Sequence, residues 1–392
     1  MRLCFVVQRF GVEVTGGAET HCRWLARRLA RDHDVRVATT CALEYGTWAN
    51  HYPPGPQTVD GLRVTRYPVA RPRSATDFAF YSDVVFHDRF TPEDERRWIE
   101  ENGPFTPALV AALPRMEGVD LFVFYSYRYY TSFHGLPAVA GRAVLVPTAE
   151  DDPAVRLPIF RDLLRSPRGL LYLTPEERAL VEEVSGNGAL PSAVVGSGVD
   201  IAPGWEAVNA RELFSLPSRY LLYLGRIDRS KGVDTLVDYY RSLAETWPEV
   251  PPLVLAGKAM IDLPAQAGIR HVGEVSETEK LALIAGSEFL ILPSLYESLS
   301  IAVLEAWALG KPVLANGECR VLEGQCLRSN GGLPYKRYAE FAPALRLLVE
   351  RPGLREAMGR AGRAYVEREY GWDVVERRTR AFLEGLPGPP AA

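Results

Sequence analysis

The sequence predicts an α/β protein built from two doubly wound parallel sheets. Short apolar runs without polar alternation recur along the chain, and segments of helix length separate them. Strands that helices cover on both faces have this pattern, whereas strands with one wetted face alternate apolar and polar residues. A chain of 392 residues is long enough for two or three domains with cores of their own.

Two successive series of these runs divide the chain into two Rossmann-like halves. The strands of the first half are expected at 3–7, 35–39, 119–124, 143–146, 169–173 and 193–195, with a helix at 18–30 after the first strand. The strands of the second half are expected at 220–224, 253–256, 270–272, 289–292 and 312–315. The domains therefore cover about 1–204 and 205–371. The segment 45–107, rich in proline, arginine and aromatic residues, is expected to hold loops and short helices inserted into the first half.

Composition excludes several classes of protein. The 45 Lys and Arg residues nearly balance 49 Asp and Glu residues, for a net charge of -4, which argues against a protein that coats nucleic acid. The five cysteines form no C-x-x-C pair, so neither a zinc site nor a disulfide framework is indicated. The apolar run at 3–7 is too short for a secretion signal, and no run approaches the roughly 18 residues of a membrane span. We therefore expect a cytoplasmic protein, for which contact with a membrane surface stays open.

Two common nucleotide-binding fingerprints are excluded. The segment 11–18 has the glycine spacing of a P-loop, but Gly17 and Ala18 stand where that motif needs Lys and Ser/Thr. The glycines at 196 and 198 lack the third glycine of a dinucleotide-binding motif, because Ile201 occupies its place.

Gly16 and Gly17 lie between the first strand and the first helix. Small residues at this position let backbone N–H groups and the positive end of a helix approach an anion. An ordinary tight turn between strand and helix explains the two glycines equally well.

The loop 224–232 also leaves a strand and opens a helix, and it carries Arg226 and Lys231. Both cations are therefore expected at the carboxyl edge of the second sheet, where open α/β sheets bind ligands. An arginine fork and a lysine point charge on one short loop suit a diphosphate. The alternative is a solvated basic loop.

The segment 293–315 predicts a polar loop, a helix and the next strand in quick succession. Ser298 and Ser300 are candidate N-caps, so the helix would present free N–H groups to a phosphate. Glu297 lies in the loop, and Glu305 follows eight positions later in the helix. A carboxylate can accept hydrogen bonds from both vicinal hydroxyls of a ribose or hexose. The flanking Leu304 and Ala306 leave open whether Glu305 faces a ligand or solvent.

Taken together and in this order, the motifs resemble the GT-B glycosyltransferases. Arg226 with Lys231, followed by Glu297-x7-Glu305, is similar to the retaining family 4 (glycosyl transferases group 1), which includes glycogen synthase-like and bacterial polysaccharide enzymes. The resemblance implies two Rossmann-like domains facing across a cleft. It also implies that a last helix, about 372–385, packs back on the first domain.

The resemblance also implies roles for individual residues. Arg226 and Lys231 would hold the donor diphosphate, Glu305 the ribose hydroxyls, and Glu297 the donor sugar. Backbone groups of the next four residues would help to hold sugar and phosphate, and Gly17, beside Gly16, would lie close to the diphosphate. These four residues are Ser298, Leu299, Ser300 and Ile301. No metal is expected, because the cations and the helix end supply the positive charge.

One position departs from the family pattern. Such enzymes carry a His after a strand of the first half, and this sequence has Glu150 at the matching place. Glu150 could bond a sugar hydroxyl or act as a base if burial raised its pKa, and His134 is a second candidate for the role. The acidic run 150–152 also resembles the metal motif of the GT-A fold, but the second half has no place in that fold.

The sequence thus predicts a glycosyltransferase that moves a hexose from a UDP- or GDP-linked sugar to a saccharide, lipid-linked or secondary-metabolite acceptor, with retention. The acceptor is expected near Gly16, the run 125–130 and the insertion 71–105. Two alternatives stay open: a catalytically impaired sugar-nucleotide-binding protein, and a GT-B sugar-nucleotide epimerase. The nucleotide base, the sugar and the oligomeric state are not predicted.

Overall fold

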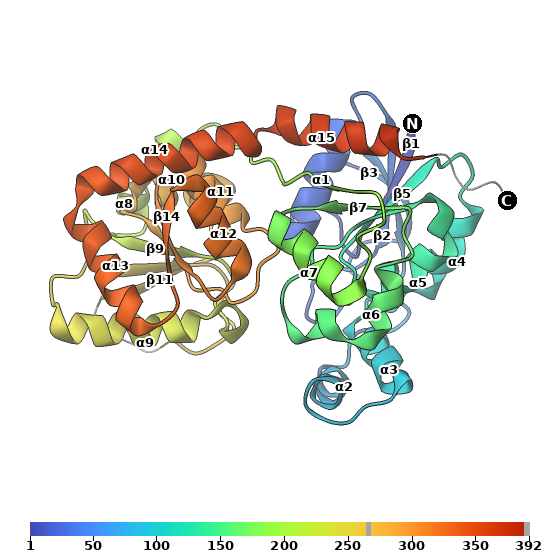
Figure 1. The fold of residues 1–392 in the computed structure, drawn as a ribbon, viewed down its shortest axis with the longest axis horizontal. Helices are drawn as coiled ribbons and strands as arrows, with labels where there is room; N and C mark the ends of the chain where they lie inside the picture. The colour runs from blue at the N-terminus through green and yellow to red at the C-terminus, as the bar shows by residue number, and fades with distance from the viewer. Residues whose placement is uncertain (264–267, 388–392) are drawn as a thin grey trace. The chain divides into compact units, whose positions relative to one another are not determined.

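The computed structural model describes residues 1–263 and 268–387, which form two compact units, each with an α/β architecture (Figure 1). Unit 1 comprises Met1–Gly196 and the chain from Glu376 onward, and unit 2 comprises Ser197–Val375. Each unit contains a sheet of mostly or wholly parallel strands with helices packed against it. The fold class that the repeated apolar runs predict is therefore confirmed.

Among the described residues, the sheet of unit 1 has the strand order β3-β4-β2-β1-β5-β6-β7-β8, and only the β3–β4 pair is antiparallel. Its strands are β1 (Arg2–Val6), β2 (Asp34–Thr40), β3 (Gly55–Val59), β4 (Leu62–Tyr67), β5 (Leu121–Tyr125), β6 (Ala143–Val146), β7 (Gly169–Tyr172) and β8 (Ser192–Val194). Its α-helices are α1 (Gly17–Leu29), α2 (Ala75–His87), α3 (Pro92–Asn102), α4 (Pro107–Ala112), α5 (Tyr130–Ala138), α6 (Pro158–Leu163) and α7 (Pro175–Ser185). The residues after β1, β5 and β6 meet at one carboxyl edge because these strands are parallel neighbours.

The hairpin β3–β4 corrects the expectation that segment 45–107 holds loops and short helices. Strand β4 alternates buried and less buried residues, which differs from the continuous apolar runs of the central strands. Asp60 and Gly61 connect the two strands, with φ of 53° and 79°. Positive φ at both central residues is the geometry that a two-residue hairpin favours, and Asp-Gly supplies it readily.

Among the described residues, the sheet of unit 2 is parallel, with the strand order β11-β10-β9-β12-β13-β14. Its strands are β9 (Leu221–Leu224), β10 (Leu253–Ala256), β11 (Ile269–Gly273), β12 (Leu290–Leu292), β13 (Val313–Asn316) and β14 (Gly332–Tyr335). Its α-helices are α8 (Ala210–Leu213), α9 (Val233–Thr246), α10 (Glu277–Gly286), α11 (Ile301–Ala308), α12 (Arg320–Ser329), α13 (Tyr338–Glu350) and α14 (Pro352–Glu369). The order reverses beside β9, so the loops after β9 and β12 lie at the switch point, where doubly wound sheets bind ligands.

The last helix, α15 (Trp372–Gly385), continues from unit 2 into unit 1. Within unit 1 its Glu376 accepts a hydrogen bond from Arg28 of α1 at 3.2 Å, and its Arg380 pairs with Asp32. These ion pairs attach α15 to α1 and to the turn that follows α1. No helix in the described part of the chain has both the length and the apolar character needed to cross a membrane.

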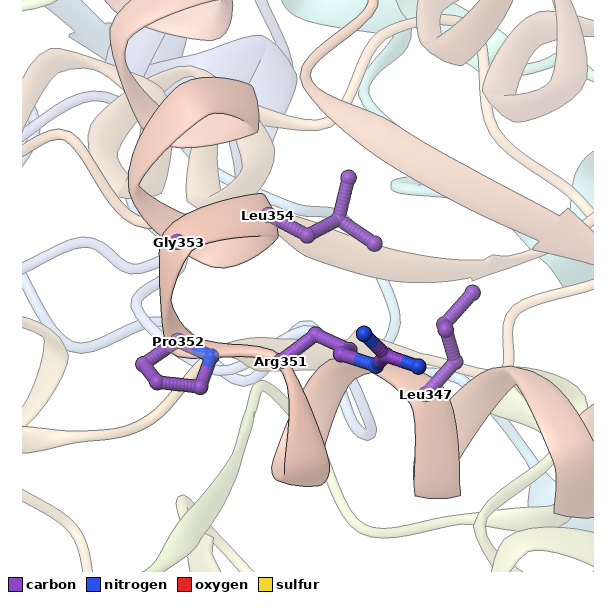
Figure 2. A pocket seen from close by; sticks show the side chains of 5 residues that line it. All are labelled: Leu347, Arg351, Pro352, Gly353 and Leu354. Atoms are coloured by element: carbon purple, nitrogen blue, oxygen red, sulfur yellow. The ribbon is translucent and has the colours of Figure 1, made fainter.

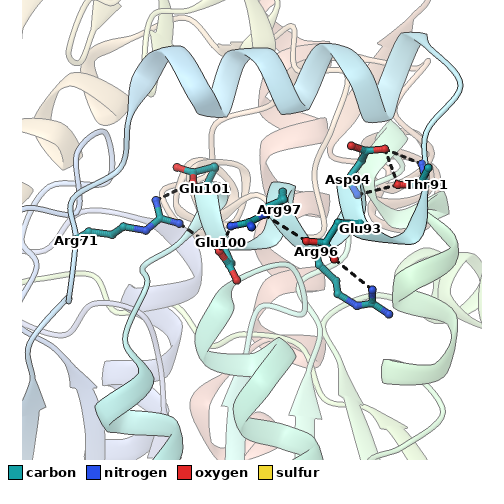
Figure 3. A network of polar contacts seen from close by, with 8 residues as sticks. All are labelled: Arg71, Thr91, Glu93, Asp94, Arg96, Arg97, Glu100 and Glu101. Atoms are coloured by element: carbon teal, nitrogen blue, oxygen red, sulfur yellow. Dashed lines mark hydrogen bonds and ion pairs between the residues drawn. The ribbon is translucent and has the colours of Figure 1, made fainter.

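Helix α3, in the inserted segment, is held by charges along its length (Figure 3). Thr91 and Asp94 form a capping box at its first turn. Near its other end, Arg71 pairs with Glu101 at 2.7 Å and with Glu100 at 3.3 Å. These contacts anchor α3 to the segment that follows β4.

His21 of α1 is a titratable group inside unit 1. It is 1% exposed and contacts the ring of Tyr125 edge-on, with 5.6 Å between centroids. Among the described residues, neither of its ring nitrogens has a hydrogen-bond partner. Burial lowers the pKa of His21 from an ordinary value of 6.5 to about 4. The unfolded chain therefore binds a proton at pH values where the folded chain does not, and acid lowers the free energy of unfolding.

Between pH 7 and pH 5, we expect the wild type to lose roughly 2 kcal/mol more stability than His21→Leu, at about 1.4 kcal/mol per pKa unit. Urea denaturation of both proteins at the two pH values measures the difference. Other titrating groups contribute equally to both proteins. Equal losses would contradict a neutral, buried His21.

Candidate functional site

The loop after β9 is ordered around Asp228. Its Oδ1 accepts hydrogen bonds from the Lys231 N–H at 2.9 Å and from the Ser230 hydroxyl at 2.6 Å, and its Oδ2 pairs with Arg226 Nε at 2.7 Å. Burial opposes the charge of Asp228, but the bonds from Ser230, Arg226 and Lys231 outweigh it and lower the pKa. Asp228, which the sequence analysis does not single out, thus fixes the guanidinium of Arg226 and the backbone of Lys231.

The two cations differ in exposure. The Arg226 side chain is 47% exposed, and its backbone carbonyl accepts a hydrogen bond from the buried Tyr223 hydroxyl at 2.6 Å. Lys231 is 24% exposed. Arg226 therefore offers its guanidinium to solvent from a fixed backbone, whereas Lys231 points toward the neighbouring loop.

Lys231 joins the two motifs of unit 2. Its Nζ lies 2.8 Å from Glu297 Oε1 and donates to the Tyr296 carbonyl at 3.4 Å. The backbones of the two loops also meet, because a Cβ on Gly232 would lie 2.5 Å from the Pro293 carbonyl oxygen. Gly232 has φ of 71°, so both its conformation and its contact require glycine. The structure therefore brings Arg226, Lys231 and Glu297 together from segments more than 60 positions apart.

Helix α11 begins beside this contact. Ser300 is its N-cap, and its hydroxyl accepts a hydrogen bond from the Val303 N–H at 3.4 Å. Ser298, Leu299 and Ser300 are buried, and Ile301 is partly exposed. The Ser300 cap holds the loop 297–300 against the start of the helix.

Glu305 of α11 is buried rather than solvent-facing, with 2% of its side chain exposed. Lys280 Nζ of α10 lies 2.7 Å from its Oε1 and 2.8 Å from Oε2 of Glu277. Burial raises the pKa of Glu305, against the attraction of Lys280. Burial also opposes the charge of Lys280, but Glu305 and Glu277 raise its pKa above the ordinary value. Lys280 is a further site residue that the sequence analysis misses.

In unit 1, a buried ion pair shapes the loop with the two glycines. Arg9 donates from Nε and Nη2 to Glu19 Oε1 at 2.9 and 2.6 Å, and the two side chains are 8% and 7% exposed. Arg9 also donates to the carbonyls of Thr15 at 2.9 Å and Leu43 at 3.0 Å, so it ties the loops after β1 and β2 together. A Cβ on Gly16, whose φ is 150°, would collide with the Glu19 carboxylate.

Gly17 is different from Gly16. No described atom lies within 4 Å of the place where a Gly17 Cβ would stand, so packing does not explain the glycine. Gly17 is exposed and is the first residue of α1. An open position at the start of a helix suits the close approach of a ligand.

Glu150 lies in the partly exposed loop that follows β6. The neighbouring Ala149 N–H donates to Glu177 Oε1 at 2.7 Å, and the Leu173 N–H donates to Glu177 Oε2 at 2.6 Å. Burial raises the pKa of Glu177 to about 8, against these two bonds, which favour the charged form. Glu177, another residue that the sequence analysis misses, thus holds the loop that carries Glu150.

The remaining acidic residues of this loop are paired. Asp151 pairs with Arg156, and Asp152 pairs with Arg128. Across residues 1–263 and 268–387, no group of three or more His, Cys, Asp or Glu side chains has the arrangement to hold a metal ion. Both aspartates of the run 150–152 are therefore engaged in ion pairs with arginines.

His134 lies in the second turn of α5. Its ring packs against Tyr130, with 4.4 Å between centroids, and against Phe133 at 4.9 Å. Burial lowers its pKa, with Glu100 opposing. These contacts are those of a packed aromatic cluster.

A separate hollow lies between α13 and α14 (Figure 2). Its lining residues are Leu347, Arg351, Pro352, Gly353 and Leu354. None of them belongs to the predicted site, so this hollow and the loops around Lys231 are different features of unit 2.

Comparison with known proteins supports the GT-B fold rather than the GT-A fold. The family of glycosyl transferases group 1 matches residues 207–365. A glycogen synthase of Mycobacterium tuberculosis is 26% identical over 403 residues, which cover 97% of this chain and 93% of that protein. The comparisons support a GT-B glycosyltransferase of the group 1 type, with the family match lying within unit 2. The matched residues include the contact between Lys231 and Glu297 and the pair of Lys280 and Glu305, whereas Gly16, Gly17, His134 and Glu150 lie outside them.

Solved structures agree on the fold of this chain. Sucrose-phosphate synthase from Thermosynechococcus elongatus is 17% identical with a TM-score of 0.69, over 98% of this chain and 99% of that one. Anabaena HepE, solved in complex with UDP and glucose, is 15% identical with a TM-score of 0.69, over 98% of this chain and 100% of that one. At these identities the likeness shows the GT-B fold and does not identify a substrate.

Proposed function

We propose that this glycosyltransferase moves a hexose from a UDP- or GDP-linked sugar to a saccharide, lipid-linked or secondary-metabolite acceptor in the cytoplasm, with retention. The observation that carries the proposal is the contact between Lys231 and Glu297, which joins the two motifs of unit 2 beside the half-exposed Arg226. The complex of the Anabaena relative with UDP and glucose supports UDP as the first nucleotide to test.

Arg226 and Lys231 would bind the donor diphosphate and stabilise the charge that develops on it as the sugar leaves. Fixed cations in a partly buried site stabilise such charge without reorganising during the reaction. Asp228 holds the Arg226 side chain and the Lys231 backbone in place. We therefore expect transfer to proceed without an added divalent metal ion.

Glu297 would bond hydroxyls of the donor sugar, and Glu305 would accept hydrogen bonds from the ribose. Glu297 is 12% exposed, so a ligand has only limited access to it while it is paired with Lys231. A diphosphate competing for Lys231 would free the Glu297 carboxylate for the sugar. The backbone groups of residues 298–301 would add hydrogen bonds to the sugar and the phosphate.

The acceptor would bind to unit 1, near Gly16, Gly17 and the loop that carries Glu150. This loop is held by Glu177, and Glu150 would bond a hydroxyl of the transferred sugar or of the acceptor. Retention would follow from attack on the same face of the sugar that the phosphate leaves, with the phosphate accepting the acceptor proton.

The proposal predicts that the protein releases a nucleoside diphosphate from UDP-glucose or GDP-mannose in the presence of EDTA. The assay uses neutral sugars, sugar phosphates and lipid-linked sugars as acceptors, and the anomeric configuration of the product is read by NMR. Acceptor-dependent release with an α-linked product from the α-linked donor supports the proposal. A β-linked product would contradict retention, and an epimerised donor without acceptor would favour the epimerase alternative. No turnover with any acceptor, but tight nucleotide binding, would favour the impaired binding protein.

A further inference from the structure

Lys280 pairs with Glu305, the last residue of the second donor motif, but Lys280 itself lies outside both motifs. Glu305 is surrounded on α11 by Leu304, Ala306 and Trp307, each fully buried. A carboxylate in such a place loses its hydration, and an ion pair with good geometry is the usual compensation. Lys280 supplies that compensation at 2.7 Å.

The position of Lys280 is itself fixed by the start of α10. Ser276 and Glu279 form a capping box, in which the Ser276 N–H donates to Glu279 Oε2 at 2.7 Å and the Ser276 hydroxyl accepts from the Glu279 N–H at 3.3 Å. Lys280 follows directly in the first turn, and α10 packs against α11. The ammonium group therefore reaches Glu305 from a rigid helix rather than from a loop.

This arrangement determines the state of the carboxylate. An ionised carboxylate can accept a hydrogen bond on each oxygen, whereas a protonated one loses part of that capacity and becomes a donor. The bond from Lys280 to Oε1 favours the ionised form and fixes the rotamer, so Oε2 and the second lone pair of Oε1 keep a defined direction.

We propose that Lys280 is a positioning residue for the donor ribose, because it holds the Glu305 carboxylate ionised and oriented to accept hydrogen bonds from the 2′ and 3′ hydroxyls of a nucleoside diphosphate. This inference rests on the proposed function, since it requires a nucleotide in unit 2. Lys280 lies outside both motifs, and its effect on the bound nucleotide passes through Glu305.

Isothermal titration calorimetry with UDP and with 2′,3′-dideoxy-UDP tests the proposal on the full chain in EDTA. We expect Lys280→Met to lower the affinity for UDP roughly ten- to hundredfold, the range for the loss of a hydrogen bond to a charged group. The affinity for dideoxy-UDP should be the same in the wild type and in Lys280→Met, because this analogue has no hydroxyl for Glu305. If Lys280 has a purely structural role, Lys280→Met would lower the affinity for UDP and for dideoxy-UDP equally, and this result would overturn the proposal. An unchanged affinity for UDP in Lys280→Met would also overturn it.

Three further variants make the result specific. Lys280→Arg keeps the charge and should recover part of the UDP affinity. Lys336→Met removes the more exposed Lys336–Glu323 pair of the same unit, which has 3.2 Å between N and O, and should leave both affinities unchanged. If Lys280→Met does not fold, Lys280→Gln replaces it in the same comparison. If the wild type binds none of UDP, GDP and ADP, the proposed function itself fails. If the wild type binds UDP and the Lys280 variant binds it equally well, only the role of Lys280 fails.

Discussion

Replacing Lys231 by alanine should lower kcat by roughly 100- to 1,000-fold, the loss that follows removal of one fixed group that stabilises developing charge. Lys231 is the cation that contacts Glu297, so its loss removes a charge from the diphosphate and also releases a carboxylate of the donor site. Nucleoside diphosphate release from the preferred donor, measured at saturating donor and acceptor, gives the change in kcat.

Two controls accompany the Lys231 variant. Lys336→Ala removes a lysine of unit 2 that belongs to neither motif and pairs with Glu323, and it should keep wild-type kcat. Thermal unfolding of Lys231→Ala shows whether the variant stays folded, since Glu297 is left without its ammonium partner. A folded Lys231→Ala protein with nearly normal kcat would contradict the role of Lys231 in stabilising the leaving group.

Replacing Arg9 by methionine should destabilise unit 1 by about 3–5 kcal/mol, the usual cost of leaving one partner of a buried ion pair without the other. Arg9 and Glu19 are both nearly buried, and the carbonyls of Thr15 and Leu43 also lose their donor. Urea denaturation at pH 7 measures the change in the free energy of unfolding.

The double variant Arg9→Met/Glu19→Leu should regain much of the lost stability, because an apolar pair leaves no charge to desolvate. As a matched control, Arg178→Met breaks the more exposed Arg178–Glu182 pair on α7 and should cost less than about 1 kcal/mol. A loss for Arg9→Met as small as the loss for Arg178→Met would show that the buried pair does not hold the loops of unit 1.

The sequence predicts the central strands well because helices bury both of their faces. Continuous apolar runs such as 143–146 and 253–256 coincide with β6 and β10. The hairpin β3–β4 escapes this pattern because its strands alternate and lie in a segment rich in proline and arginine. The local sequence feature that indicates this hairpin is the Asp60-Gly61 turn. Strand β14 (Gly332–Tyr335) is missed because it is short and contains a proline.

The candidate site is predictable only where its residues belong to a local motif. Arg226, Lys231 and Glu297 each follow a recognisable strand, and parallel strands bring such residues to one edge. Lys280 and Glu177 have no local signal, because each acts on a loop or helix that is distant in sequence. The burial of Glu305 also depends on the packing of α10 against α11. The pattern of apolar residues around Glu305 does not predict that packing.

The most direct test of the nucleotide site is isothermal titration calorimetry of UDP and GDP, in EDTA, with the wild type, Arg226→Ala and Arg351→Ala. Arg351 lines the separate hollow between α13 and α14 and serves as the control for a surface arginine. We expect one site per chain for one of the two nucleotides, an affinity loss of roughly tenfold or more in Arg226→Ala, and no change in Arg351→Ala. Absence of binding in the wild type, or equal binding in Arg226→Ala, would contradict a nucleoside diphosphate site built on the loops after β9 and β12.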